Sequence, residues 1–176
     1  MNQYYTNPLK NSILATIPLL LIGNSILSQC YIACTGRGQL IPSYPSYTIT
    51  ASATWSGEEY YRMGNNDLTI SGAGTTLTID GPCIEFNHAT PREIVIDSGA
   101  TLVLKGGTNI YGSSDTPWKG IRIRSGGTLI IEGTTAPFNA TIAFAKNAVL
   151  AENTTSESVF SISGASFCDN ITGISV

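Results

Sequence analysis

A phrase written three times in the middle of the chain constrains its fold more than any other feature. The copies are TLTIDG at 76–81, TLVLKG at 101–106 and TLIIEG at 128–133. Their first threonines stand 25 and 27 residues apart. A second apolar phrase precedes each copy, at 68–70, 94–96 and 121–123. Self-similarity at a period of roughly 20–50 residues marks a repeat architecture, so we expect a solenoid in which each period forms one coil.

Side chains alternate between the two faces of a strand, so in each copy the second and fourth residues share one face, while Thr78, Val103 and Ile130 point outward. The inward positions expected from this alternation form a structural ladder of Leu77, Ile79, Leu102, Leu104, Leu129 and Ile131. No helical period lies between the strand phrases, and a looser fourth copy follows at 160–164. Two or three short strands per coil, stacked about 4.8 Å apart, describe a parallel β-helix of about four coils.

Aromatic residues also recur in this register. Phe86, Tyr111 and Phe138 each follow a repeat glycine by five residues. We expect them to form a ladder in the core, and a platform for sugar rings is the alternative. Trp118 is expected to pack at a corner, with ligand contact as the alternative. Trp118 and Tyr111 are thus the candidate ligand-contact residues.

Charged residues occupy one position on three successive coils, as Asp80, Lys105 and Glu132. Opposite charges on neighbouring strands stabilise a sheet modestly, so alternating signs predict a surface charge ladder. The alternative is a carboxylate pair, Asp80 with Glu132, at the wider spacing used by inverting glycoside hydrolases. Lys105 between them favours the ladder, and we expect no catalytic residues in this chain.

The composition excludes several classes of function. Charged residues are only 12% of the chain, about half the usual share, and the net charge is −3. The nine Lys and Arg residues look scattered, which argues against a nucleic-acid partner. His88 is the single histidine, and no Asp-rich loop resembles a calcium site. We therefore expect no metal and no cofactor.

The N-terminal residues 1–29 have the three-part pattern of a secretory signal peptide. Lys10 precedes an apolar run at 13–22, which is too short for a membrane-spanning helix of about 20 residues. We expect export and no membrane span after cleavage near Ser28 or Gln29. Two alternatives remain open: lipidation at Cys30, and an anchor that is never cleaved.

The cysteines divide into a close pair and two distant residues. In an exported chain, Cys30 and Cys34 are the expected disulfide, while Cys83 and Cys168 are expected to be buried small hydrophobes. Residues 30–66 are expected to form an irregular cap with a first strand, and residues 67–176 the coils. A solenoid needs a capping unit at its end, and the last residues of this sequence look like another coil strand instead of a cap. We therefore expect the chain to be the N-terminal part of a longer protein.

The repeat phrases carry a resemblance as well. GTTLTIDG, SGATLVLKGG, WKGIRIRSGGTLIIEG and ASFCDNITGISV resemble right-handed parallel β-helix repeats of secreted and surface proteins of Bacteroidetes-type bacteria, within the pectin-lyase-like superfamily. The likeness runs from about Thr48 to Val176. It implies a right-handed winding. That fold houses both polysaccharide-cleaving enzymes and non-catalytic adhesins, so the likeness specifies fold more than activity.

Three hypotheses for function follow. The first is a non-catalytic, monomeric scaffold, secreted or at the cell surface, that mediates adhesion or contacts a polysaccharide or a host or cell-surface glycan. The second is the N-terminal part of a polysaccharide lyase or glycoside hydrolase whose active site lies beyond Val176. The third is a purely structural spacer, which predicts no aromatic-lined groove.

Overall fold

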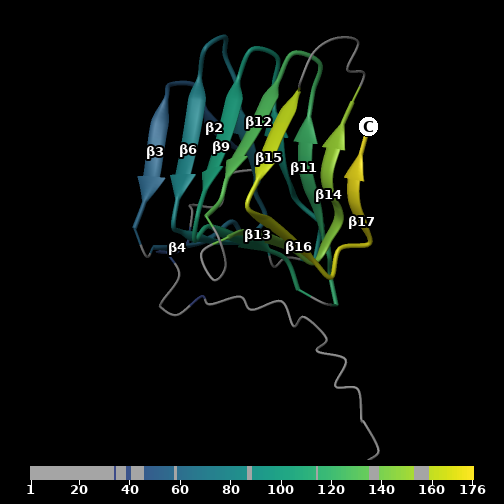
Figure 1. The fold of residues 1–176 in the computed structure, drawn as a ribbon. Helices are drawn as coiled ribbons and strands as arrows, with labels where there is room; N and C mark the ends of the chain where they lie inside the picture. Colours follow the sequence, from purple (N-terminus) through teal and green to yellow (C-terminus); the bar gives the residue numbers. More distant parts are fainter. Residues whose placement is uncertain are drawn as a thin grey trace, which may run out of the picture.

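The chain folds into an all-β parallel solenoid of about four turns, as the repeat predicts. This computed structural model describes residues 34, 39–40, 46–57, 59–86, 89–113, 115–134, 139–152 and 159–176. Each coil gives one strand to each of three parallel sheets. In Figure 1 the strands of one sheet point down and those of another point up, and successive coils follow one another across the view from left to right.

The three sheets are named here by their strands. Sheet A contains β1 (Gln39–Leu40), β4 (Tyr60–Arg62), β7 (Cys83–Glu85), β10 (Asn109–Tyr111), β13 (Ala140–Ala143) and β16 (Ala165–Cys168). Sheet B contains β2 (Ser46–Ile49), β5 (Asp67–Ile70), β8 (Glu93–Ile96), β11 (Trp118–Ile123), β14 (Ala145–Ala151) and β17 (Thr172–Ser175). Sheet C contains β3 (Ala53–Ser56), β6 (Thr76–Asp80), β9 (Thr101–Lys105), β12 (Thr128–Glu132) and β15 (Phe160–Ser163).

Regular pairing begins before Asp67, the start expected for the coils. β2 pairs in parallel with β5, and β3 with β6. Three half-buried aromatic residues, Tyr47, Trp55 and Tyr61, pack against the core in this first coil, with ring centroids 4.9–6.1 Å apart. The first coil is therefore part of the solenoid, and its aromatic side chains add apolar contacts at that end of the core.

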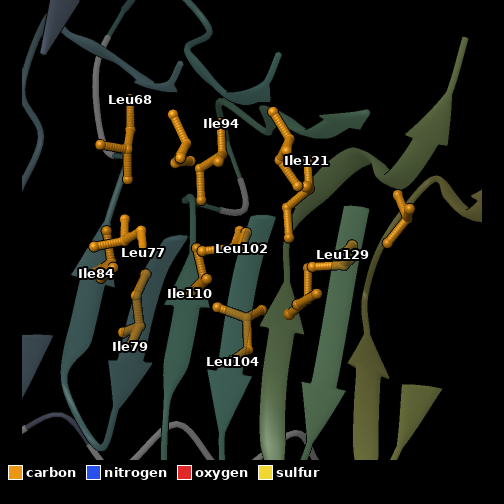
Figure 2. Close-up of a cluster of buried hydrophobic side chains, with 14 of the residues drawn as sticks. Leu68, Leu77, Ile79, Ile84, Ile94, Leu102, Leu104, Ile110, Ile121 and Leu129 are labelled. Atoms are coloured by element: carbon orange, nitrogen blue, oxygen red, sulfur yellow. The ribbon is translucent and has the colours of Figure 1, made fainter. Parts of the chain in front are cut away.

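The core is a set of aliphatic ladders that point into the space between the sheets (Figure 2). The six ladder residues named from the sequence in sheet C are all 0–1% exposed. Sheet A contributes Ile84, Ile110 and Ile142, which stand in register on successive coils at 0% exposure. Since the central coils repeat this aliphatic inward set, the outer faces of their sheets carry what distinguishes one of these coils from the next.

The expected column of three aromatic residues is wrong. Tyr111 pairs with Glu85, not with Phe86. The turn before β10 contains one residue more than the turn before β7, and a shift of one residue moves a side chain to the opposite face. Phe86 is therefore buried, at 1% exposure, while Tyr111 is half-buried on the outer face of sheet A. Phe138 lies outside the described residues.

Trp118 takes the place beside Phe86 instead. It is fully buried, its ring stacks on Phe86 with centroids 4.7 Å apart, and its Nε1 donates to the Ala143 carbonyl at 2.9 Å. The absence of a side chain at Gly112 makes space for this indole ring, because a Cβ there would lie 2.8 Å from the indole Cδ1. Trp118 thus packs at a corner, and its buried ring is closed to a ligand.

The expected Cys30–Cys34 disulfide is also corrected. Cys34 is bridged to Cys83, with Cα atoms 5.9 Å apart and a sequence separation of 49. Cys83 belongs to the outward column of sheet A that includes Tyr60 and Asn109. Cys168 is disulfide-bonded too, so it is not the free small hydrophobe that its position suggested. Cys30 lies outside the described residues. The strand register decided the Cys34–Cys83 pairing, because it turns Cys83 outward.

Candidate functional site

A pocket of about 340 Å³ opens on the outer face of sheet B, and we call it the sheet B pocket. It is lined by Glu93, Lys119, Gly120, Ile121, Arg122, Lys146, Asn147, Leu150 and Glu152. These residues come from β8, β11, β14 and the residue that follows β14, so three successive coils build it. The pocket combines cations, carboxylates, an amide and an apolar side chain.

A β-bulge lies at the centre of the pocket. The pairing of β11 with β14 shifts by one residue between Gly120 and Ile121, so that Ala148 is the extra residue on β14. Gly120 has a φ of +107°, and a Cβ there would lie 1.5 Å from the Asn147 carbonyl oxygen. Only glycine fits this backbone position. The element WKGI, which carried part of the sequence resemblance, is therefore a bulge that re-aims the side chains around it.

Arg122 occupies the middle of a charge network. Its Nη2 lies 2.6 Å from Glu93 Oε1, and its Nη1 lies 3.7 Å from Glu152 Oε2. The buried Nε has no hydrogen-bond partner in the described part of the chain. Glu93 Oε1 also forms an ion pair with Lys119, whose Nζ lies 3.6 Å away. Both pocket carboxylates are thus engaged with Arg122, and this holds the guanidinium in one position.

Lys146 is exposed and lies directly across from Lys119, because Trp118 pairs with Ala145 and Gly120 with Asn147. Among the ion pairs within the described ranges, none involves Lys146. Like charges opposite one another on neighbouring strands destabilise a sheet. The solenoid tolerates this arrangement at the pocket without giving Lys146 a carboxylate.

Sequence reasoning missed this site by treating the basic residues as scattered. Arg92, Lys119 and Lys146 stand at intervals of 27 residues, the same interval as that between the second and third repeat phrases. The Lys119 amide of β11 donates to the carbonyl of Arg92, the residue before β8, at 2.8 Å, which places the two residues beside one another on successive coils. This regular interval is the sequence signal from which the basic column could have been found.

A second polar cluster lies on the outer face of sheet A. The Tyr60 hydroxyl donates to Glu85, and Arg62 Nε lies 3.2 Å from the same carboxylate. Burial and the bond to Glu85 raise the pKa of Tyr60, and burial raises that of Tyr111. Phenols held protonated in this way act as hydrogen-bond donors. Ligand contact by Tyr111 stays a prediction, since its ring is half-buried on this outer face.

The tyrosines of β4 predict a dependence of stability on alkaline pH. Burial and the hydrogen bond to Glu59 raise the pKa of Tyr61 to about 12 from 10.0. The unfolded chain loses this proton first, so above pH 10 it binds fewer protons than the folded chain, and stability falls as pH rises toward 12. Urea denaturation between pH 9 and 12 should show this decline, and Tyr61→Phe should make it shallower. Equal slopes for the two proteins would contradict the assignment.

The charged ladder of sheet C has the expected register. Glu132 pairs with Lys105, and Asp80 occupies the same position one coil earlier. No ion pair within the described ranges joins Lys105 to either carboxylate. The described residues also contain no group of three or more His, Cys, Asp and Glu side chains arranged to hold a metal. Nor do they include a helix long and apolar enough to cross a membrane.

No protein-family model, no curated protein and no solved structure matches the chain. The chain is therefore characterised by its architecture, a parallel β-solenoid scaffold, and by the pocket that three of its coils build on sheet B.

Proposed function

We propose that the chain is an exported, non-catalytic β-solenoid scaffold that binds a glycan in the sheet B pocket. The observation that carries the proposal is the lining of that pocket, which mixes donors, acceptors and the half-buried Leu150 in about 340 Å³. A sugar ring offers hydroxyl groups that both donate and accept, together with an apolar C–H surface. Concave sites with a few convergent polar groups beside apolar side chains are typical of small-ligand recognition.

Export is supported by the disulfide chemistry. Cys34 and Cys83 are bridged and Cys168 is disulfide-bonded. Disulfides persist in oxidising compartments and are rare in the cytosol. The signal-peptide pattern of residues 1–29 agrees with this, as does the resemblance to secreted and surface proteins of Bacteroidetes-type bacteria, whose pectin-lyase-like fold also handles polysaccharides. Together these features favour a place outside the cytoplasm.

A binding role is favoured over catalysis by the pairing of the pocket carboxylates. Glycoside hydrolysis requires one carboxyl group to act as a general acid while a second acts as a base or nucleophile. Glu93 Oε1 and Glu152 Oε2 both lie against the Arg122 guanidinium, at 2.6 and 3.7 Å. Both pocket carboxylates are therefore engaged in ion pairs within the protein, which favours a binding role. The lyase or hydrolase hypothesis is tested in the same experiment as binding.

The experiment is a glycan array probed with the folded, disulfide-intact chain, followed by titration of the glycans that bind. Leu150→Ala should weaken binding about fivefold, because about 1 kcal/mol of apolar contact is lost. Ile130→Ala is the matched control, since Ile130 is a half-buried, outward-facing residue of sheet C, away from the pocket. It should bind like the wild type.

Three outcomes would count against the proposal. Absence of binding to any glycan would defeat it, and so would equal losses in the two variants. Release of unsaturated or reducing sugar ends from a bound polysaccharide would show that the chain is a lyase or a hydrolase.

A further inference from the structure

We infer that the sheet B pocket selects an acidic sugar, whose carboxylate or sulfate group is bound between Lys119 and Lys146. This inference rests on the proposed function, because it names the class of glycan that the same pocket takes. It also assigns a binding role to Lys119 and Lys146, which look like ordinary surface lysines in the repeat.

The charge balance of the pocket is positive. Three cations line it, Lys119, Arg122 and Lys146, against two carboxylates, Glu93 and Glu152. The whole chain, by contrast, has a net charge of −3. A local excess of positive charge in an acidic chain raises the local concentration of anions over that of neutral ligands.

The carboxylates are held by Arg122 more closely than by the lysines. Glu93 lies 2.6 Å from Arg122 but 3.6 Å from Lys119, and the Lys119 side chain is 51% exposed. An exposed pair at this distance contributes little to stability, so Lys119 is available to a second anion. Lys146 has no ion pair within the described ranges, as noted above. The two ammonium groups therefore form the part of the network with uncompensated charge.

The register brings these two cations within reach of one anionic group. Neighbouring parallel strands lie about 4.8 Å apart, and Lys119 and Lys146 occupy opposed positions on β11 and β14. A carboxylate or sulfate between them would relieve the repulsion of like charges. The sugar ring would then lie toward Asn147 and Leu150, which line the same pocket.

The basic column ends at Arg92, which limits the size of the acidic group that is recognised. Arg92 is only 19% exposed, lies 3.6 Å from Asp67, and donates to Asn65. Its charge is therefore engaged within the protein. The site fits one acidic group bound by two lysines, and a long polyanion along the solenoid axis is not required.

The test uses three polymers with one backbone: dextran, carboxymethyl-dextran and dextran sulfate. The wild-type chain should bind at least one acidic polymer about tenfold more tightly than dextran. Lys146→Gln and Lys119→Gln should each remove most of this preference. Lys105→Gln, on the outer face of sheet C, removes the same charge away from the pocket and should leave the preference intact. Raising the salt from about 50 to about 500 mM should weaken the acidic complexes.

Each outcome decides the question. Preference for the carboxymethyl polymer alone identifies a carboxylated sugar, and preference for the sulfate polymer alone identifies a sulfated one. Equal binding of dextran and the acidic polymers overturns the inference, as does an acid preference that Lys146→Gln leaves unchanged. Failure to bind any of the three polymers also overturns it, while the glycan array decides separately whether the proposed glycan-binding function survives. Thermal unfolding of each variant at the wild-type temperature establishes that the fold is intact.

Discussion

Replacing Gly120 with alanine is expected to lower the free energy of unfolding by about 4 kcal/mol. The residue has a φ of +107°, which L side chains rarely adopt. A Cβ would also lie 1.5 Å from the Asn147 carbonyl oxygen and 2.7 Å from its carbonyl carbon. Both are backbone atoms of β14, so the clash is relieved only by separating β11 from β14 at the bulge. Urea denaturation of the disulfide-intact protein measures the change.

Gly173→Ala is the control for this substitution. Gly173 lies in β17 of the same sheet, and a Cβ there would meet nothing within 4 Å. The expected change is within about 0.5 kcal/mol. If Gly120→Ala changed stability as little as the control does, the bulge between Gly120 and Ile121 would not exist in solution.

Removing the Cys34–Cys83 disulfide is expected to cost a similar amount. The bridge joins residues 49 positions apart. Closing a loop of that length in the unfolded chain corresponds to about 4 kcal/mol on the chain-entropy estimate. Cys34→Ala and the double variant Cys34→Ala/Cys83→Ala should both show this loss in denaturation without reductant. A reducing agent is avoided because Cys168 is disulfide-bonded as well.

The two cysteine variants separate the effect of the bridge from the effect of packing. Cys83 is 7% exposed, so replacing it adds the loss of one buried sulfur, about 1 kcal/mol. The single variant isolates the bridge, since Cys34 is only half-buried. A single variant as stable as the wild type would show that the bridge does not constrain the unfolded chain.

The sequence predicted sheets B and C because their signal is local. Alternation within TLTIDG, TLVLKG and TLIIEG depends only on the period of a strand, and the fixed period of the phrases predicts stacking in register. Leu77, Leu102 and Leu129 are buried for this reason. Sheet A was harder to predict, because its strands are short and follow turns of unequal length. One extra residue before β10 was enough to turn Tyr111 outward.

The candidate site depended on distances between coils. Lys119 and Lys146 are 27 residues apart in sequence and opposed in space. That their two positive charges are neighbours can be recognised only when the strand register is known. The bulge at Gly120, which shifts that register along β11, left only a glycine as its trace in the sequence. The disulfide was missed for the same kind of reason, since nearness in sequence favoured Cys30 over Cys83 as the partner of Cys34.

By itself, the sequence determined a repeating strand pattern and hence the parallel solenoid with its aliphatic interior. These follow from the two-residue period of a strand, which needs no knowledge of contacts between coils. Only the tertiary structure decided that Cys34 bonds Cys83, that Trp118 fills the space left by Gly112, and that two lysines meet at the edge of a pocket. Turn lengths and one bulge set the register between coils, and that register decides which outward side chains become neighbours.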